Sequence, residues 1–371
     1  MRVSERMKSY NLLGDINRTM SRMLKTQQDL ATTTTIHKPS DDPGGTTRLM
    51  QVNGALKRNE RYQKNVEDAS EQLLTTEAAV TGVMDLINLA DNLLLQASND
   101  TLGADERRTL AEQMEVYWIR SIDLGNQEFA DRYIFGGTNN ATRPYSQTNQ
   151  FEDETFTSVH DTAVNLGQVG LTAGSVTVTS SDGSVTYAEG TDYTIDYDNG
   201  TLTALSTGTM ADATDFLVSY ETDSPSGVVL NPNGVDGQIS RVIDEGVQMT
   251  VNFSATEVFG DQNDLQNTLR SAYNALMRND AEAFGDLRTE LTSQRDVVTG
   301  KLGQIGTKIN ALTLQQEKLE ADNTNYQKLV SSIEDTNMAE AMVQLEQDQA
   351  IYEASLQVSA QLIKNTLLDY L

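Results

Sequence analysis

The placement of proline constrains this chain more than any other feature of its sequence. No proline falls between 44 and 143 or after 232. A proline inside a helix costs about 3 kcal/mol, so both proline-free tracts can form long helices. The segment between them, 139–240, is instead rich in Thr, Ser, Gly, Asp and Val. The five prolines are Pro39, Pro43, Pro144, Pro225 and Pro232.

Apolar residues recur in the two tracts at alternating steps of three and four, which is the coiled-coil period. One stripe runs over 49–94 and another over 298–333. A single helix over 46–98 would span about 80 Å at 1.5 Å per residue. We therefore expect an elongated helical bundle, with a shorter helix over 104–129.

Further apolar stripes at both ends of the chain predict terminal helices. A lone helix gains little from propensity and leaves its stripe uncovered. We therefore expect 1–35 and 338–371 to be mobile in the monomer and to fold when neighbouring copies cover them. The candidate assembly and chaperone residues are Val3, Met7, Tyr10, Ile16, Met20, Met342, Leu345, Tyr352, Leu356, Ile363 and Tyr370.

The stretch KPSDDPGGTTRL at 38–49 separates the N-terminal helix from the first long tract. Pro39 and Pro43 force the residues before them into extended backbone. We interpret Asp41 and Asp42 as turn and cap residues rather than as an acidic site. Ser40 or Asp41 is predicted to cap the helix that follows.

A matching break is predicted in SIEDTNMAEA at 332–341. Asn337 suits the N-cap position, and Glu340 three residues later would complete a capping box. Both arms therefore change direction at comparable distances from their ends, so the two terminal stripes can lie side by side.

The middle of the chain reads as β structure. Asp182-Gly183 and Asn199-Gly200 each lie between alternating apolar runs, which predicts two hairpins with type I′ turns. A further strand is expected in DFLVSYET (215–222), and a last strand pair within 237–260.

The predicted fold class is mainly α with a β insert, in which long N- and C-terminal helices pack as an elongated coiled-coil bundle. We expect three domains along the chain. Terminal helices comprise 1–45 with 336–371, and a helical bundle with a β hairpin comprises 46–140 with 237–335. A β-rich insert comprises 141–236.

The formal net charge of −27 excludes several partners. Binding to nucleic acid needs a basic footprint, and an anionic membrane surface is disfavoured for the same reason. No stretch approaches the ~20 apolar residues of a membrane span. Residues 1–30 contain no apolar run, so we expect no cleaved signal peptide.

The chain shows no catalytic or cofactor-binding pattern. It has no cysteine, and its two histidines, His37 and His160, lack zinc-site spacing. We expect His37 to be a solvated loop residue, and we expect no enzyme activity, metal or cofactor. A calcium site built from Asp182, Asp192, Asp196 or Asp198 is a weaker interpretation than a solvated acidic surface.

Three segments resemble a known family. These are INRTMSRMLKTQQDLATTTTIHKPSDDPGGTTRL (16–49), RYIFGGTNNATRPY (132–145) and SSIEDTNMAEAMVQLEQDQAIYEASLQVSAQLIKNTLLDYL (331–371). They are similar to the bacterial flagellin superfamily. The PSDDP turn and the final Leu-Asp-Tyr-Leu resemble its hook-associated members more than filament flagellins. The resemblance covers roughly 1–145 and 237–371.

The resemblance implies a structural subunit that joins the flagellar hook to the filament. In such proteins the terminal helices form an inner tube (D0), the bundle forms the next shell (D1), and the variable insert (D2) faces outward. It implies self-assembly in a helical ring, with a neighbouring hook-associated protein and flagellin as partners. It also implies export by the flagellar type III apparatus to the extracellular flagellum. An export chaperone would bind the C-terminal helix along 342–371.

Two other functions stay open from the sequence. One is flagellin itself, the filament subunit. The other is a secreted coiled-coil stalk carrying a β carbohydrate-binding or hydrolytic head.

Overall fold

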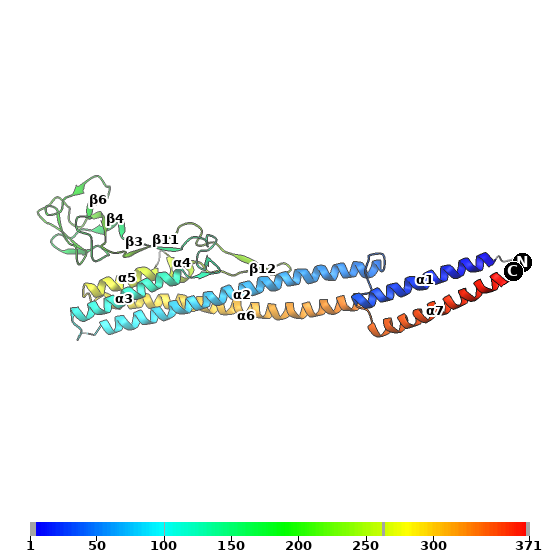
Figure 1. The fold of residues 1–371 in the computed structure, drawn as a ribbon. Helices are drawn as coiled ribbons and strands as arrows, with labels where there is room; N and C mark the ends of the chain where they lie inside the picture. The colour runs from blue at the N-terminus through cyan, green and yellow to red at the C-terminus, as the bar shows by residue number, and fades with distance from the viewer. Residues whose placement is uncertain (1–4, 100, 262–263, 369–371) are drawn as a thin grey trace. The chain divides into compact units, whose positions relative to one another are not determined.

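The computed structural model describes residues 5–99, 101–261 and 264–368 (Figure 1). The chain forms two compact units. The terminal unit comprises Met1–Gln63 with Glu317–Leu371, and the body comprises Lys64–Gln316. Two long helices, α2 (Pro43–Ala97) and α6 (Ala283–Glu334), contribute to both units.

The terminal unit is helical. It contains α1 (Glu5–Thr32) and α7 (Met338–Leu368), with the first part of α2 and the last part of α6. α1 and α7 lie side by side in Figure 1. Figure 1 shows that the α2 and α6 segments run antiparallel. Two amide side chains connect them: Asn59 Nδ2 donates to the Leu319 carbonyl at 2.7 Å, and Asn323 Nδ2 donates to Gln63 Oε1 at 3.2 Å.

The body has a helical core built on the predicted stripes. It adds α3 (Ala104–Gly125), α4 (Ala255–Phe259) and α5 (Asp264–Met277) to the long helices. Fully buried apolar residues recur every seven positions, as a coiled-coil seam requires. In α2 they are Val66, Leu73, Val80, Ile87 and Leu94, and in the body part of α6 they are Val298, Ile305 and Leu312.

One expectation about α2 was wrong. The helix contains an 18-residue window with mean hydropathy 1.3, which suits a membrane span by length and composition alone. However, 44% of that window is buried inside the fold. Asp91 on α2 also pairs with Arg288 Nε at 2.7 Å. An apolar stripe covered by neighbouring helices and an ion pair on the same helix indicate a core helix of the bundle.

The β insert packs two small sheets around one core. A four-stranded sheet has the order β4 (Gln150–Thr157), β10 (Asp215–Glu221), β6 (Thr177–Ser180), β7 (Thr186–Tyr187). A three-stranded sheet has the order β5 (Ala163–Asn165), β9 (Thr201–Ala204), β8 (Tyr193–Asp196). The shared core includes Leu166, Leu171, Val178, Tyr193, Leu202, Phe216, Val218 and Tyr220.

Three two-stranded pairs complete the body. β3 (Tyr145–Thr148) pairs with β11 (Gly227–Leu230) at the point where the chain enters and leaves the insert. β12 (Ser240–Asp244) pairs with β13 (Val247–Thr250), which confirms the strand pair expected within 237–260. β1 (Glu128–Phe129) pairs with β2 (Arg132–Tyr133).

Both predicted hairpins form, but their predicted turn type was wrong. β6 pairs with β7 and β8 with β9 across loops longer than two residues. Only the glycines, Gly183 and Gly200, have positive φ (70° and 60°). A type I′ turn needs two such residues. That geometry occurs instead between β1 and β2, at Ala130 (φ 49°) and Asp131 (φ 59°).

A polar ladder on α5 holds the insert against the helices. Residues four apart share a helix face. Asn274 in α5 and Arg278, the residue that follows the helix, both bind insert carbonyls. Asn274 Nδ2 donates to Gly167 O. Arg278 Nη2 donates to Gln168 O and Nε to Asn199 O, both at 2.8 Å. These bonds join two insert loops to one helix, so the insert is docked rather than loosely tethered.

Replacing Arg278 by alanine should loosen the insert. The change removes charge-assisted bonds to two carbonyls, each worth about 1.5–3 kcal/mol. We expect faster amide exchange and proteolysis at 166–170 and 198–200, while α2 and α6 stay protected. R108A, at an exposed position on α3, is the matched control and should leave exchange unchanged. Equal protection in R278A and wild type would contradict the docking role.

A half-buried carboxyl makes the insert sensitive to pH. Tyr220 Oη lies 2.7 Å from Glu154 Oε2 and also within hydrogen-bonding distance of the Leu166 carbonyl. A phenol can donate only one hydrogen bond. A protonated Glu154 satisfies both contacts, because it can donate to Tyr220 while Tyr220 donates to Leu166. Burial raises the pKa of Glu154 above its ordinary 4.5, against the opposing effect of the Tyr220 bond.

The insert should lose stability as pH rises through the pKa of folded Glu154. A raised pKa means that the folded state binds this proton more tightly than the unfolded state does. The stabilisation is therefore complete below about pH 4.5 and falls as the pH rises above it. In E154Q the amide stays neutral, so the insert's melting temperature should vary less between pH 4.5 and 7. Calorimetry at a series of pH values tests this, and an unchanged pH slope would refute it.

Candidate assembly surface

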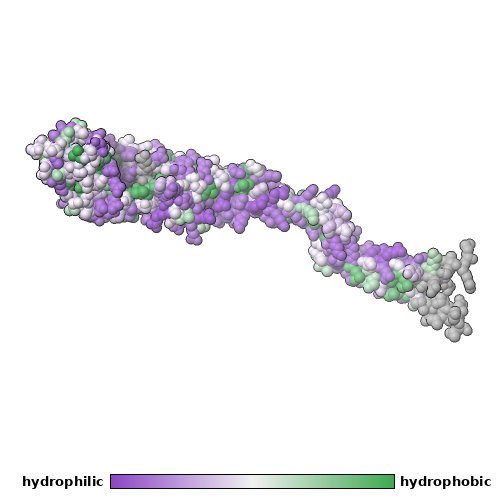
Figure 2. Space-filling model, turned by 90° about the horizontal axis from the view of Figure 1, so that it is seen from above, coloured by the Kyte–Doolittle hydropathy of each residue, from purple (hydrophilic) through white to green (hydrophobic). Residues whose placement is uncertain are grey.

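α1 and α7 carry large apolar side chains on faces that the described chain does not cover. Tyr10 is 81% exposed and Met7 61%. Figure 2 shows hydrophobic patches among polar surface along this helix pair. Contiguous exposed apolar surface of this kind marks interaction sites. The exposed set is Met7, Tyr10, Leu13, Met20 and Leu24 on α1, with Met338, Met342, Val343, Ile351, Leu356 and Val358 on α7.

The seam between α1 and α7 is mixed, with mostly apolar residues on α1 and mostly small or polar residues on α7. Its buried and half-buried residues follow alternating steps of four and three, the coiled-coil pattern. On α1 the residues that follow this pattern are Leu12, Ile16, Thr19, Met23, Thr26 and Leu30; Gly14 and Asp29 are also half-buried. On α7 they are Ala341, Leu345, Asp348, Tyr352, Ser355 and Ser359. Pairing within one chain therefore covers only part of the apolar surface of each helix, and large apolar side chains remain exposed on both.

The predicted assembly residues divide between these two faces. Met7, Tyr10, Met20, Met342 and Leu356 are exposed. Ile16, Leu345 and Tyr352 lie in the seam instead. Val3 and Tyr370 lie outside the described residues, as does the side chain of Ile363. The apolar periodicity of the sequence did not separate the exposed residues from the seam residues. The apolar arc of each helix is wider than the seam, so it includes both.

The two chain breaks are joined to each other. Thr34 and Asp335 form an isolated antiparallel bridge. Beside it, Thr35 N donates to Glu334 O at 2.7 Å. The sequence predicted both breaks but not their pairing, because each break is a local signal and the bridge needs both. The bridge therefore holds the C-terminal end of α1 next to the N-terminal end of α7.

The start of α2 is capped by Asp42, which corrects the expected cap at Ser40 or Asp41. Asp42 Oδ1 accepts from Gly45 N at 2.9 Å, and Pro43 takes the first helical position, where proline is favoured. Asp41 Oδ2 accepts instead from Lys38 N at 2.9 Å and from the amide of His37. The bond from Lys38 N lowers the pKa of Asp41. Pro39 lies in the turn that Asp41 closes.

His37 is not the solvated loop residue we expected. Its Nε2 lies 2.8 Å from Asp29 Oδ1, and the two side chains are only 13% and 16% exposed. Asn337 lies directly before α7, and its Oδ1 accepts from Glu340 N at 3.4 Å. The structure shows this half of the predicted capping box without the reciprocal bond from Glu340.

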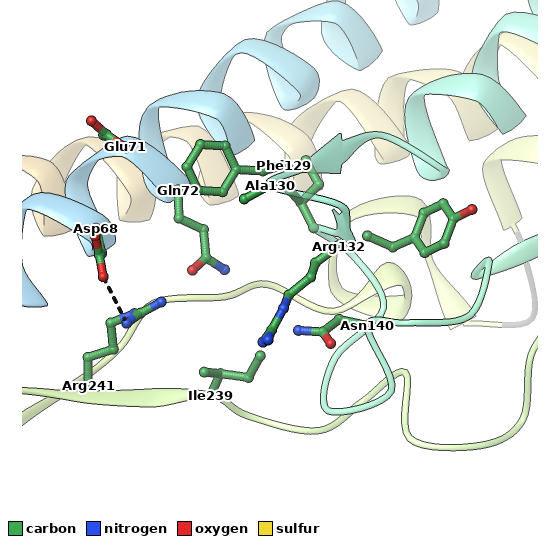
Figure 3. Close-up of a pocket in the computed structure, with 11 residues that line it drawn as sticks. Asp68, Glu71, Gln72, Phe129, Ala130, Arg132, Asn140, Ile239 and Arg241 are labelled. Carbon is green, nitrogen blue, oxygen red and sulfur yellow. Dashed lines mark ion pairs between the residues drawn. The ribbon is translucent and has the colours of Figure 1, made fainter.

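A surface pocket of the body lies between the long helix α2 and two strand pairs. The pocket, shown in Figure 3, has a volume of about 560 Å³ and is lined by α2, the β1–β2 hairpin and β12. Its charges include an ion pair, since Arg241 Nη1 lies 3.6 Å from Asp68 Oδ2. Within 5–99, 101–261 and 264–368, no group of three or more His, Asp or Glu could hold a metal.

Two of the four acidic residues considered for calcium accept hydrogen bonds from nearby backbone and hydroxyl groups. Asp182 Oδ1 accepts from the Ser180 hydroxyl and Ser184 N. These bonds lower the pKa of Asp182 to about 2. Asp192 accepts from Ala188 N and Thr209 N. The carboxylates of these two residues are therefore committed to backbone and hydroxyl donors.

Two family models match the helical parts of the chain. The bacterial flagellin N-terminal helical region matches residues 3–140, and the bacterial flagellin C-terminal helical region matches 286–371. Together they include α1, α2, α3, α7 and nearly all of α6.

Comparison with curated and solved proteins gives named relatives. Flagellar hook-associated protein 3 of Salmonella typhimurium is 25% identical over 148 residues, and that of Escherichia coli is 26% identical. Each match covers 40% of this chain and 47% of the relative, so the chain spans about half the length of the curated relatives it matches.

A solved chain of Vibrio parahaemolyticus, assigned as a flagellar hook-associated protein, shares the fold. Its TM-score is 0.52 at 13% identity, and the match covers 80% of this chain and 100% of that one.

Substituting Asp42 should weaken the first turn of α2. Loss of an N-cap carboxylate typically costs about 1 kcal/mol. In D42A we expect faster amide exchange at Gly45 and Thr46, with the rest of α2 unchanged. S40A is the matched control and should exchange at the wild-type rate. A larger effect in S40A than in D42A would restore the cap that the sequence suggested.

Proposed function

The chain belongs to the bacterial flagellin family, and we propose that it is a structural subunit of the flagellum that joins the hook to the filament. The observation that carries this proposal is the distribution of apolar residues on α1 and α7. Each helix exposes large apolar side chains, such as Tyr10 and Met342, that the described chain does not cover. Such a pair is incomplete alone and is stabilised by neighbouring subunits that cover its outer faces.

The named relatives support the junction role over the filament role. Both curated matches are hook-associated protein 3 rather than flagellin. A secreted stalk with a hydrolytic or sugar-binding head is less well supported, because the family models cover both helical arms. The described insert core is made of aliphatic and aromatic side chains rather than paired catalytic acids. We accordingly propose a structural, non-enzymatic protein without a cofactor.

The proposal extends to assembly and location. Copies of the chain would associate in a helical ring, between a neighbouring hook-associated protein and flagellin, outside the cell. The three expected domains would then correspond to inner tube (1–45 with 336–371), next shell (46–140 with 237–335) and outward insert (141–236). Before export through the flagellar type III apparatus, a chaperone would bind the exposed face of α7, in the manner of a helix in a groove.

Deletion of the gene separates the junction role from the filament role. A junction protein is needed to retain the filament, so cells lacking it should keep their hooks and release filament protein into the medium. Immunoblots of cell and medium fractions measure this outcome. Absence of filament protein from both fractions would instead identify the chain as flagellin.

Polar substitution of the outer face should block assembly without unfolding the subunit. Each buried leucine or methionine contributes about 1.5–3 kcal/mol to an interface, so M342S/L356S should reduce filament attachment at least tenfold. Both residues are already exposed, and the melting temperature of the monomer should not fall. V185S, which changes an exposed apolar residue of the insert, is the control. Wild-type attachment in M342S/L356S would contradict an assembly role for this face.

A further inference from the structure

Asp348 is an unusual residue at the centre of the α1–α7 seam. Its side chain is only 1% exposed, and both carboxylate oxygens are buried without a hydrogen-bond partner among the described residues. Its charge partner is Arg22 on α1, whose Nη2 lies 3.6 Å from Asp348 Oδ1 and whose side chain is 60% exposed. A buried carboxylate paired this way contributes little net stability, because its desolvation offsets the attraction.

The residues one heptad away from Arg22 and Asp348 determine which charges would meet if the two helices slipped. Seven residues to either side of Arg22 lie Asp15 and Asp29, which are both acidic. Seven residues to either side of Asp348 lie Ala341 and Ser355, which are both neutral. A coiled coil that slips by one heptad keeps its seam but shifts every cross-helix pair. Either one-heptad slip would therefore bring buried Asp348 against an aspartate instead of an arginine.

We propose that Asp348, together with Arg22, Asp15 and Asp29, fixes the register in which α1 and α7 pair. Only the observed alignment gives Asp348 an opposite charge, and both neighbouring alignments give it a like charge. A polar residue in a coiled-coil seam can specify register at a cost in stability. The proposal concerns the pairing of the helices, so it does not depend on the flagellar assignment.

Apolar packing in the seam does not by itself fix the register of α1 and α7. Small and polar residues fill much of the α7 side, so apolar packing distinguishes poorly between alignments. The bridge of Thr34 with Asp335 holds only the base of the pair. Arg22 lies about 18 Å along α1 from Thr34 at 1.5 Å per residue. The charge pattern therefore controls alignment where the bridge no longer does.

Cysteine trapping in the full-length chain tests the register directly, because the native sequence contains no cysteine. The Arg22–Asp348 pairing places Thr26 opposite Leu345, so T26C/L345C should form an intramolecular disulfide. T26C/Y352C reports the alignment in which Asp348 faces Asp29. Disulfide formation needs Cα atoms within about 7 Å, whereas a seven-residue slip displaces the helices by about 10 Å. Because oxidation traps transient pairing, a sparsely populated alignment is still detected.

Two variants distinguish register control from simple packing. In D348L the slipped disulfide should increase about tenfold relative to the native one, because the like-charge contact in the slipped alignment is gone. In R22D/D348R the local ion pair is kept, but α1 then presents aspartate at 15, 22 and 29. The slipped disulfide should increase there too. R18Q, which removes only the exposed Asp15–Arg18 ion pair, is the control and should retain the native ratio.

Each other outcome overturns the proposal. If D348L keeps the native disulfide ratio, Asp348 does not specify register. If R22D/D348R gives the same ratio of slipped to native disulfide as the native chain, Asp15 and Asp29 do not contribute to fixing the register. If neither disulfide forms in the otherwise native chain, α1 and α7 do not pair in this manner. Circular dichroism of each variant checks that helix content is retained.

Discussion

The weak seam between α1 and α7 is the constraint on which the rest of the terminal unit depends. Hydrophobic association scales with the apolar area removed from water, and much of the α7 side of this seam is alanine, serine and a buried aspartate. Other large apolar side chains, such as Tyr10 and Ile351, stay exposed. Covering these outer faces would therefore add to the stability that the pair gains from its own seam.

In the body, unlike the terminal unit, the apolar seam is fully buried within one chain. Its α2 and α6 stripes are fully buried at heptad positions, and α5 binds the insert through Asn274 and Arg278. The proposed assembly would therefore involve the exposed faces of the terminal helices, while the body keeps its own buried core. The charge of −27 supports this behaviour, because like charge resists non-specific association.

Local signals made much of the fold predictable. The absence of proline over 44–143 and the recurrence of Val66, Leu73 and Val80 gave α2 within a few residues of its observed bounds. The Asp-Gly and Asn-Gly pairs gave the hairpins, although not their turn type, since the local pattern does not fix how many residues the loop contains. The α2 cap was misplaced by one or two residues because Ser40, Asp41 and Asp42 are all good capping residues, and only the backbone geometry chooses among them.

The sequence by itself determined the approximate extent of the long helices, and it placed an apolar arc on each terminal helix, because periodicity acts over a few residues. It did not fix every helix end: the helix expected over 104–129 ends at Gly125. Only the tertiary structure decided which part of that arc faces the partner. It placed Leu345 and Tyr352 in the seam and left Met342 and Leu356 exposed. It also buried Asp348 beside Arg22 and His37 beside Asp29. These contacts join residues far apart in the chain or on either side of a turn, so their energies depend on a partner surface that no local pattern describes.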